Sequence, residues 1–426
     1  MIVSIVLIFA SMFLFAMAFG TLWWMMYAWR TPENLAETRF TEPDGTQGLF
    51  FSLLVPARHE QAVLAHTVGR LLESRYSDYE VLVIVGHDDP GTTAVAQEVA
   101  ARHPERVRVV VDTHEVKSKP KALNTALPYC RGEVVGVFDA EDQVHPSLLG
   151  HVDHAFRSTD VAVVQGGVQL INFTSSWYSL RNCMEYFFWF RSRLHLHARH
   201  GFIPLGGNTV FVRSRVLRDI GGWDPDCLAE DCDLGVRLSS AGARVVVAYD
   251  ADMVTREETP DSLYGLLKQR TRWNQGFLQV YRKREWTRLP TLNQRLLARW
   301  TLGNPFLQAF AGLVIPLGIA LALLAEVPVG IALISFAPLL PALVTVAFEA
   351  VGLHDFGVQY GMRVRSWHYV KLVLGSPFYQ MVLSAAAMRA VWREMRGQHG
   401  WELTHHVGAH LNEPDIRVPC EVRSEG

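Results

Sequence analysis

Acidic side chains follow three of the short apolar runs in this sequence. Glu60 comes after the first run, Asp88 and Asp89 come after the second, and Asp139, Glu141 and Asp142 come at the end of the fourth. Carboxylates that gather at one edge of a sheet repel one another unless a divalent cation or the donors of a ligand neutralise them. Because hard oxygen ligands suit Mg²⁺ or Mn²⁺ that bridges phosphates, these residues predict a site for a divalent metal and a phosphorylated ligand.

A basic stretch lies between the third and fourth runs. The segment "KSKPKALN" (117–124) places three lysines at the start of a predicted helix. Positive charge there opposes the helix dipole, which favours anions at the N-terminus. A phosphate that docks at this helix end would relieve the conflict, and a solvated basic turn is the alternative.

The elements that would position these residues alternate in type. Apolar, β-branched runs that read as buried strands cover 49–57, 79–86, 106–112, 133–140 and 161–167, and helical patterns cover 61–74, 92–102 and 119–129. This alternation predicts a parallel, doubly wound α/β sheet, in which ligands bind at the carboxyl ends of the strands. The chain has no G-x-G-x-x-G after the first run and no G-x-x-x-x-G-K-[ST], which argues against hydride transfer and P-loop hydrolysis.

Long apolar segments flank this region. Residues 2–28 carry almost no charge and end in aromatic residues and Arg30, a pattern typical of a membrane anchor rather than a cleaved signal peptide. Two more spans are predicted near 305–324 and 327–351. A fourth stretch, 369–392, is broken by Gly-Ser-Pro, so it either spans the membrane or forms a re-entrant or surface-lying hairpin.

The bulk composition narrows the function classes. The chain has 426 residues, of which 49% are hydrophobic and 19% charged, and its formal net charge is −2. We expect no nucleic-acid partner, because there is no basic run of the length that such binding needs. The five scattered cysteines show neither a disulfide framework nor paired C-x-x-C spacing, which fits a reduced, cytosolic setting.

Seven short motifs occur in a recognisable order. They are "VPARHE", the two aspartates after the second run, "KPKALN", "FDAED", "GGNTVFVRSRVL", "AEDCDLGVRL" and "QRTRW". Over roughly residues 50 to 300, and in the flanking membrane segments, the chain resembles membrane-embedded family 2 glycosyltransferases, which include cellulose, chitin, hyaluronan and poly-N-acetylglucosamine synthases. The resemblance implies a GT-A fold, a nucleotide-sugar donor, a divalent metal, and inversion at the anomeric carbon.

The resemblance also implies roles in donor binding. Glu60, Asp88 and Asp89 would hold the base and ribose of the nucleotide, and Lys121 would approach its phosphates. Asp139 matches the first acid of the D-x-D motif, which binds metal and diphosphate. The third position of that motif is Glu141 and Asp142 follows it, so either of the two is the second contact.

Two further motifs carry the catalytic residues that the resemblance implies. Glu230 and Asp231 match the acidic pair that contains the catalytic base, and we expect the base to be Asp231. Gln269, Arg272 and Trp273 match the Q-x-x-R-W signature, with spacing that places all three on one helical face towards the pocket.

The chemistry explains why these residue types are needed. A sugar hydroxyl is a poor nucleophile, so a carboxylate must accept its proton as it attacks the anomeric carbon. The leaving nucleoside diphosphate is activated by charge neutralisation, which requires a metal and an arginine fork. Direct displacement puts the base and the diphosphate on opposite faces of the sugar ring, and the two acidic clusters, about 90 residues apart, can serve one face each.

One residue of the last motif and one segment before it are predicted to lie at the membrane interface. Arg270 lies off the helical face of the signature residues, so we expect it to meet lipid headgroups. Residues 173–201 place aromatic residues, arginines and histidines at helical spacing, which indicates an interfacial amphipathic helix rather than a metal site.

The predicted layout is an N-terminal transmembrane helix (1–30), a cytosolic GT-A domain with interfacial helices (31–303), a transmembrane region (304–392) and a C-terminal tail (393–426). The predicted activity is that of a processive, inverting β-glycosyltransferase at the cell membrane, which elongates a polysaccharide from UDP-glucose or UDP-N-acetylglucosamine. Such an enzyme would contact membrane lipids and accessory secretion or modification proteins. The alternative is the transfer of one sugar to a membrane lipid, which the small number of spans favours.

Overall fold

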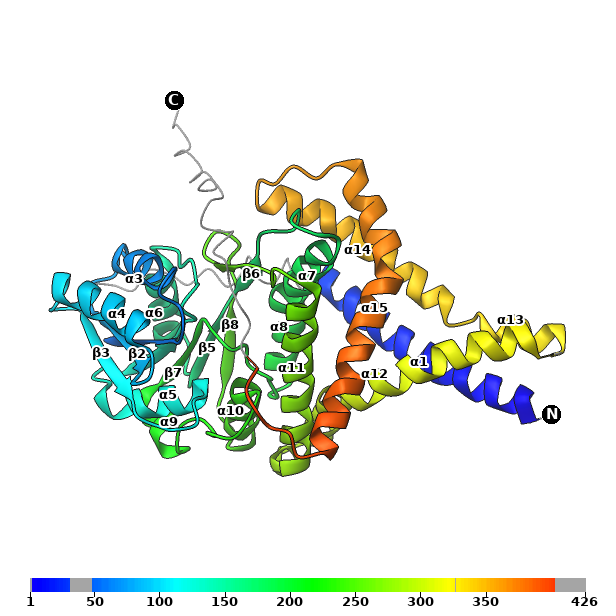
Figure 1. Ribbon diagram of the computed structural model, residues 1–426, viewed down its shortest axis with the longest axis horizontal. Coiled ribbons are helices and arrows are strands. Elements are labelled where there is room, and N and C mark those ends of the chain that lie inside the picture. The colour runs from blue at the N-terminus through cyan, green and yellow to red at the C-terminus, as the bar shows by residue number, and fades with distance from the viewer. Residues whose placement is uncertain (1, 31–47, 326, 403–426) are drawn as a thin grey trace.

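Seven strands form the central sheet of this computed structural model, which describes residues 2–30, 48–325 and 327–402 (Figure 1). In sheet order they are β3 (Val107–Asp112), β2 (Tyr79–Gly86), β1 (Phe51–Ala57), β4 (Val134–Val137), β7 (Val210–Arg213), β5 (Val163–Gly166) and β8 (Val245–Ala248). Only β7 is antiparallel to its neighbours, β4 and β5. The predicted GT-A class, a mostly parallel α/β sheet, is confirmed.

Strand β7 was not predicted as a strand, although the motif "GGNTVFVRSRVL" contains it. Its four residues are too short a run to separate from the neighbouring apolar segments by periodicity alone. A second, two-stranded sheet pairs β6 (Val168–Leu170) with β9 (Thr255–Glu257) in parallel.

Helices cover both faces of the central sheet. A strand in the middle of such a sheet is shielded from water on both sides, and every residue of β2 is buried accordingly. One face packs against α3 (Leu64–Leu72), α4 (Pro90–Arg102) and α6 (Leu148–Ser158). The other face packs against α5 (Lys119–Ala126), α9 (Ser214–Asp219), α10 (Glu230–Ser240) and α8 (Leu194–Arg199). Two short 3₁₀ turns, Leu127–Tyr129 and Glu285–Arg288, complete the elements of this domain.

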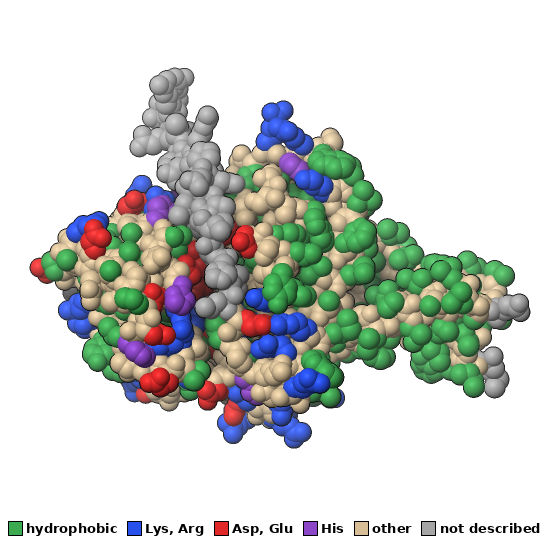
Figure 2. All heavy atoms as spheres, viewed as in Figure 1, with side chains coloured by type: hydrophobic (Ala, Val, Ile, Leu, Met, Phe, Trp, Pro, Cys, Tyr) green, Lys and Arg blue, Asp and Glu red, His purple; other side chains and the backbone are tan. Residues whose placement is uncertain are grey.

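Long helices extend from one side of the sheet domain (Figure 1). They are α1 (Ile2–Arg30), α12 (Leu292–Leu324), α13 (Val329–Ser335), α14 (Leu339–Gln359) and α15 (Ser366–Met395). Four segments are long and apolar enough to cross a membrane, namely Ile2–Tyr27, Leu292–Leu321, Val329–Gln359 and Ser366–Met395. Figure 2 shows apolar side chains covering the part of the molecule that α1, α12 and α13 form, whereas charged side chains are scattered over the sheet domain.

The fourth apolar stretch is one continuous helix, α15, which passes through Gly375, Ser376 and Pro377 without a break. Of the two alternatives that the sequence left open for this stretch, the continuous helix fits a span rather than a hairpin. A proline in a helix removes one backbone hydrogen bond, and packing can hold the helix together around it. Helix α15 has such packing, because it lies along α11 (Leu263–Lys283) and α12.

The segment predicted as an amphipathic helix forms α7 (Trp177–Phe188), a π-helical turn (Trp189–Arg193) and α8. Most residues of α7 are buried, and they join a cluster that includes Met25 of α1 and Phe356 of α14. The helix therefore lies between the sheet domain and the long helices.

Candidate active site

One cavity of about 1270 Å³ joins the carboxyl ends of the central strands to the long helices. We call its two parts the catalytic end and the membrane end. The charged residues that line the catalytic end are Arg58, Glu60, Asp112, Lys117, Lys119, Asp139, Glu141, Glu230, Asp231, Glu257 and Arg272. The membrane end is lined by residues of α1, α12, α13, α14 and α15 and by the charged residues Arg181, Glu185, Arg193, Arg270 and Glu349.

The acids after β4 face different surroundings. Asp139 and Glu141 line the cavity, whereas Asp142 is fully buried outside its wall. Asp142 accepts hydrogen bonds from the Asp139 backbone N–H at 2.8 Å and from the Asn208 amide at 2.9 and 3.0 Å. Asp142 therefore shapes the turn that presents Asp139, and Glu141 is the neighbour of Asp139 that faces the cavity.

A further acid of this cluster, Glu257 at the end of β9, was missed by the sequence analysis. It lines the cavity and accepts a hydrogen bond from Asn208. Burial and the charges of Asp139 and Glu141 raise its pKa to about 8. Its place two residues after the β-branched pair Val254 and Thr255 was the signal that could have identified it.

These acids fit a divalent cation that takes its other ligands from a diphosphate and from water. Burial and the charges of Glu141 and Asp139 raise the pKa of Glu60 to about 8, as they do for Glu257, and a bound cation would offset this repulsion. Among the described residues, no three His, Cys, Asp or Glu side chains are arranged as a complete metal site.

The second acidic cluster begins helix α10. Glu230 and Asp231 occupy its first turn, where their charges complement the helix dipole. Burial and the charge of Asp231 raise the pKa of Glu230 to about 7. Burial also raises the pKa of Asp231, although the Cys232 backbone N–H at 2.7 Å and the charges of Lys119 and Arg272 oppose that rise.

Lys119 connects the two acidic clusters. Its buried ammonium group donates hydrogen bonds to Asp139 and, at 2.8 Å, to the carbonyl of Gly207. The charges of Asp139, Glu230 and Asp231 raise its pKa. The lysine expected near the phosphates, Lys121, lies outside the described cavity wall and within 3.8 Å of Asp226. Both lysines belong to "KSKPKALN" and both lie on α5. The placement of this helix in the fold decides that Lys119, and not Lys121, lines the cavity.

Two glycines let the backbone approach Asp231 and Glu230 closely. A Cβ atom on Gly207 would lie 3.2 Å from Oδ2 of Asp231 and 3.7 Å from Nζ of Lys119. A Cβ atom on Gly276 of α11 would lie 2.4 Å from Cβ of Ala229, the residue before Glu230. Larger residues at either position would displace the catalytic end, which explains the glycines in "GGN" and "NQG".

The acids after β1 and β2 separate into one cavity residue and two supporting residues. Glu60 lines the cavity. Asp89 caps α4 through the Thr92 backbone N–H at 3.1 Å and binds the backbone N–H of His59 at 2.6 Å, so it fixes the loop that leads to Glu60. Asp88 lies outside the described cavity wall and forms an ion pair with Arg58 at 3.0 Å.

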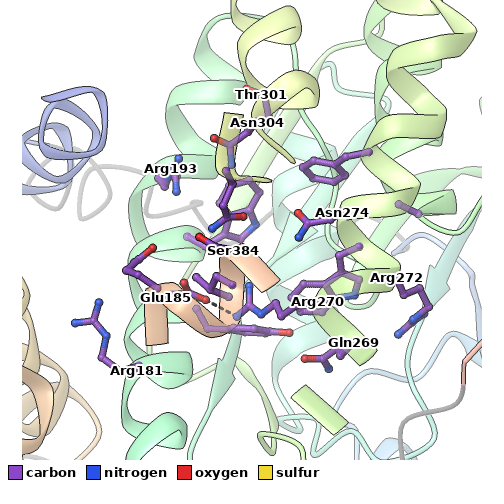
Figure 3. Close-up of a pocket in the computed structure, with 18 of the residues that line it drawn as sticks. Arg181, Glu185, Arg193, Gln269, Arg270, Arg272, Asn274, Thr301, Asn304 and Ser384 are labelled. Carbon is purple, nitrogen blue, oxygen red and sulfur yellow. Dashed lines mark hydrogen bonds and ion pairs between the residues drawn. The ribbon is translucent and has the colours of Figure 1, made fainter. Parts of the chain in front are cut away.

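The three signature residues of α11 all line the cavity, as their spacing predicts (Figure 3 labels Gln269 and Arg272). The guanidinium of Arg272 lies 4.5 Å from the centre of the Trp401 ring. Its charge lowers the pKa of Asp231. The buried Oε1 of Gln269 has no hydrogen-bond partner among the described residues, so it is available to a ligand.

The expectation for Arg270 was wrong. Its guanidinium donates to Glu185, Asn182 and the Tyr379 hydroxyl and lies 4.7 Å from the Trp273 ring centre (Figure 3). Helix α7 packs against this side of α11 together with α15, so a face that would meet lipid in an isolated helix is buried here.

Comparisons with known proteins agree with this geometry. Residues 48–276 match the family described as "Glycosyltransferase like family 2". The chain is 30% identical over 237 residues to the beta-monoglucosyldiacylglycerol synthase of Trichormus variabilis, which covers 54% of this chain and 50% of that protein. It is 25% identical over 291 residues to the poly-beta-1,6-N-acetyl-D-glucosamine synthase of Staphylococcus aureus, covering 64% of this chain and 66% of that protein.

A solved structure extends the likeness of the fold to the long helices. The mannosyltransferase PcManGT from Pyrobaculum calidifontis, in complex with GDP-Man and Mn²⁺, superposes with a TM-score of 0.61 at 19% identity. The match covers 91% of this chain and 99% of the mannosyltransferase. In contrast, the chain spans about half the length of the beta-monoglucosyldiacylglycerol synthase that it matches in sequence. This chain is a glycosyltransferase of family 2, with a GT-A sheet domain and four apolar helices that fit association with a membrane.

Proposed function

We propose that this enzyme transfers one sugar from a nucleotide-sugar donor, with inversion, to a lipid acceptor that enters the cavity from the membrane. The sequence favours a growing polysaccharide as acceptor, and the cavity favours the lipid. The observation that carries the proposal is the change from polar to apolar lining along the membrane end.

The cavity-lining face of α12 shows this change most clearly. Near the sheet domain the face presents the indole of Trp300 and three polar side chains, Thr301, Asn304 and Gln308. Further along the helix it presents only Ala311, Val314, Ile315, Gly318, Ile319 and Leu323. Helix α14, which runs the opposite way, presents Glu349 near the domain and Leu339 far from it. This arrangement suits an amphiphile whose polar head points to the catalytic end.

The far part of the membrane end is open at the surface of the helices. Ile315, Ile319 and Leu323 line the cavity and are nevertheless 44%, 56% and 79% exposed. An acyl chain could therefore enter sideways from the bilayer, because these apolar side chains form the entrance. The similarity to a beta-monoglucosyldiacylglycerol synthase supports the same class of acceptor.

The catalytic residues follow from the geometry of direct displacement. The acceptor oxygen attacks the anomeric carbon, the bond from that carbon to the diphosphate oxygen breaks, and Asp231 accepts the hydroxyl proton. The Gly207 carbonyl accepts a hydrogen bond from Lys119, and the missing side chain of Gly207 leaves space beside Asp231. Arg272 and Lys119 stabilise the negative charge that develops on the leaving diphosphate.

A divalent cation, Mg²⁺ or Mn²⁺, would supply further charge neutralisation at the diphosphate when bound. Asp139 and Glu141 would hold it, because both line the cavity and both raise the pKa of neighbouring carboxyls. The fold-level likeness to a mannosyltransferase that binds Mn²⁺ supports the same requirement. We propose that the nucleotide of the donor is uridine diphosphate and that Glu60 lies at the donor side of the cavity.

The proposed site requires the sheet domain to face the cytosol, where nucleotide sugars are made, with the chain crossing the cell membrane more than once. Arg30 at the domain side of the first span agrees with the excess of positive charge on cytoplasmic loops. A polysaccharide acceptor is the second candidate, which is supported by the indole of Trp273 in the cavity wall, where a sugar ring could stack.

Product analysis tests the proposal. The purified full-length chain in lipid nanodiscs would be incubated with radiolabelled UDP-glucose, UDP-N-acetylglucosamine or GDP-mannose and a mixed lipid extract. We expect label in one organic-soluble glycolipid of fixed mobility. A water-soluble product whose size grows with time would contradict the lipid acceptor and select the polysaccharide.

A further inference from the structure

The charged side chains of the membrane end do not balance. Three guanidinium groups and two carboxylates line it. Arg181 binds Glu349 through both carboxylate oxygens, and Arg270 binds Glu185. Because each carboxylate already has an arginine partner, Arg193 is left as the cation without an ion pair among the described residues.

Arg193 ends the π-helical turn between α7 and α8. Such wide turns within longer helices often occur at functional sites. The guanidinium carbon lies 5.1 Å from the ring centre of Trp24 and 5.4 Å from that of Trp189. Its buried Nε has no hydrogen-bond partner among the described residues.

Burial lowers the pKa of Arg193 to about 10, so its surroundings disfavour its charge, and the two neighbouring rings offer no hydrogen-bond acceptors. Ring faces attract a cation, but they do not replace the acceptors that five N–H donors need. The neighbouring histidines add no charge, because burial lowers the pKa of His195 to about 4 and that of His197 to about 3. A buried guanidinium that is left in this state is costly unless a ligand supplies an anion.

We propose that Arg193 binds the phosphate of a membrane amphiphile whose chains occupy the apolar part of the cavity. This inference rests on the proposed lipid acceptor and names the chemistry of its head region. The planar guanidinium matches two phosphate oxygens at once. Figure 3 draws Arg193 together with Thr301 and Asn304, the polar residues of α12 that precede its apolar lining.

The position of Arg193 in the fold agrees with a headgroup at the membrane surface. Trp24 belongs to the aromatic end of α1, and tryptophan is enriched where a helix leaves the hydrocarbon region. The phosphate could belong to the acceptor itself or to a phospholipid that binds beside a neutral acceptor. Both sources present the same group to Arg193.

A binding measurement without donor tests the site independently of transfer. The full-length chain in dodecyl maltoside micelles, which carry no phosphate, would be titrated with dioleoyl phosphatidic acid or with dioleoylglycerol, which have the same chains and differ by the phosphate. We expect tighter binding of phosphatidic acid by about tenfold or more, as hydrogen bonds to a charged group provide. The preference should vanish in Arg193→Gln and survive in part in Arg193→Lys, which keeps the charge without the fork.

The matched control is Arg199→Gln, because Arg199 ends α8, the helix that directly follows Arg193, and is exposed. It should keep the preference of the unaltered chain. Equal binding of the two lipids by the unaltered chain would overturn the proposal, as would an unchanged preference in Arg193→Gln with native thermal stability. A polysaccharide product together with a phosphate preference lost in Arg193→Gln would refute only the lipid acceptor.

A transfer assay separates the two sources of the phosphate. Label that enters a phosphate-bearing lipid, such as dioleoyl phosphatidylglycerol, assigns the phosphate to the acceptor. Label that enters dioleoylglycerol, and increases when phosphatidic acid is added, assigns it to a bystander phospholipid. If phosphate-bearing lipids neither accept label nor change the transfer, the proposal is wrong.

Discussion

The two ends of the cavity carry opposite imbalances of charge. At the catalytic end seven carboxylates line the wall with four cationic side chains, whereas at the membrane end three guanidinium groups share two carboxylates. A divalent cation would complete the first end, and an anionic headgroup would complete the second. One continuous cavity can therefore hold both substrates, with their reacting groups near Asp231 of the catalytic end.

The largest expected effect breaks the catalytic end alone. Asp231→Asn removes the base but keeps the shape of the side chain, so transfer should fall by roughly 10²–10⁴-fold. Radiometric transfer and equilibrium binding of UDP would be measured in parallel, and UDP binding should persist. Asp219→Asn is the control, because the Asp219 side chain is 72% exposed. Transfer at the normal rate in Asp231→Asn would refute the assignment of the base.

The next effect concerns the leaving group. Arg272→Ala should lower kcat/KM for the donor by roughly 10²–10³-fold, the effect of losing a donor to developing charge in a dry site. Arg272→Lys should recover little, because an ammonium lacks the fork. Steady-state kinetics checks both variants. Arg282→Ala on the same helix, where the side chain is 65% exposed, should change little. Equal effects of Arg272→Ala and Arg282→Ala would refute the assignment.

A smaller effect should break the membrane end alone. A Cβ atom on Gly318 meets no heavy atom within 4 Å, and Gly318 lines the apolar part of the cavity. Gly318→Leu should therefore fold normally and fill the space for an acyl chain. We expect about a tenfold rise in KM for the lipid, equivalent to ~1.4 kcal/mol, with unchanged donor hydrolysis. Gly330→Leu, at another glycine with open space, is the control. A change in donor hydrolysis would contradict the separation of the two ends.

The smallest effect is a change in the pH profile. Burial raises the pKa of Asp231, and activity needs its ionised form, so transfer should decrease as the pH falls through that value. Burial and the charge of Asp231 raise the pKa of Glu230 to about 7, so Glu230 is neutral where Asp231 titrates. Glu230→Gln should therefore leave the acidic limb of kcat/KM in place and remove the change in the profile near pH 7 that the ionisation of Glu230 causes. Glu98→Gln, at an exposed acid, should alter neither feature. A shift of the acidic limb in Glu230→Gln would contradict this order of ionisation.

Much of the catalytic end could be predicted from the sequence because it depends on local patterns. Acids placed directly after buried strands must gather at one edge of a parallel sheet, as Glu60 and Asp139 do. The spacing of Gln269, Arg272 and Trp273 fixes their common helical face. The sequence could not separate Lys119 from Lys121, or Glu141 from Asp142, because each choice depends on which of two side chains, one or two positions apart, points into the cavity.

The membrane end depends on contacts between distant segments. The burial of Arg270 requires α7 and α15 to pack against α11, and the pairing of Arg181 with Glu349 joins residues 168 positions apart. The polar-to-apolar change along α12 is present in the sequence, but its meaning depends on which face lines a cavity. The domain boundaries and the roles of single residues stay predictions.

Mapping the contacts of a photoactivatable lipid tests the two-ended cavity most directly. Diacylglycerol with a diazirine either next to the headgroup or near the chain terminus would be cross-linked to the full-length chain, and the adducts located by mass spectrometry. The account predicts that the first label reacts at Asn304 and Gln308 and the second at Ile315 and Ile319. Adducts confined to Leu313 and Leu317, which are exposed on α12 outside the cavity wall, would contradict it.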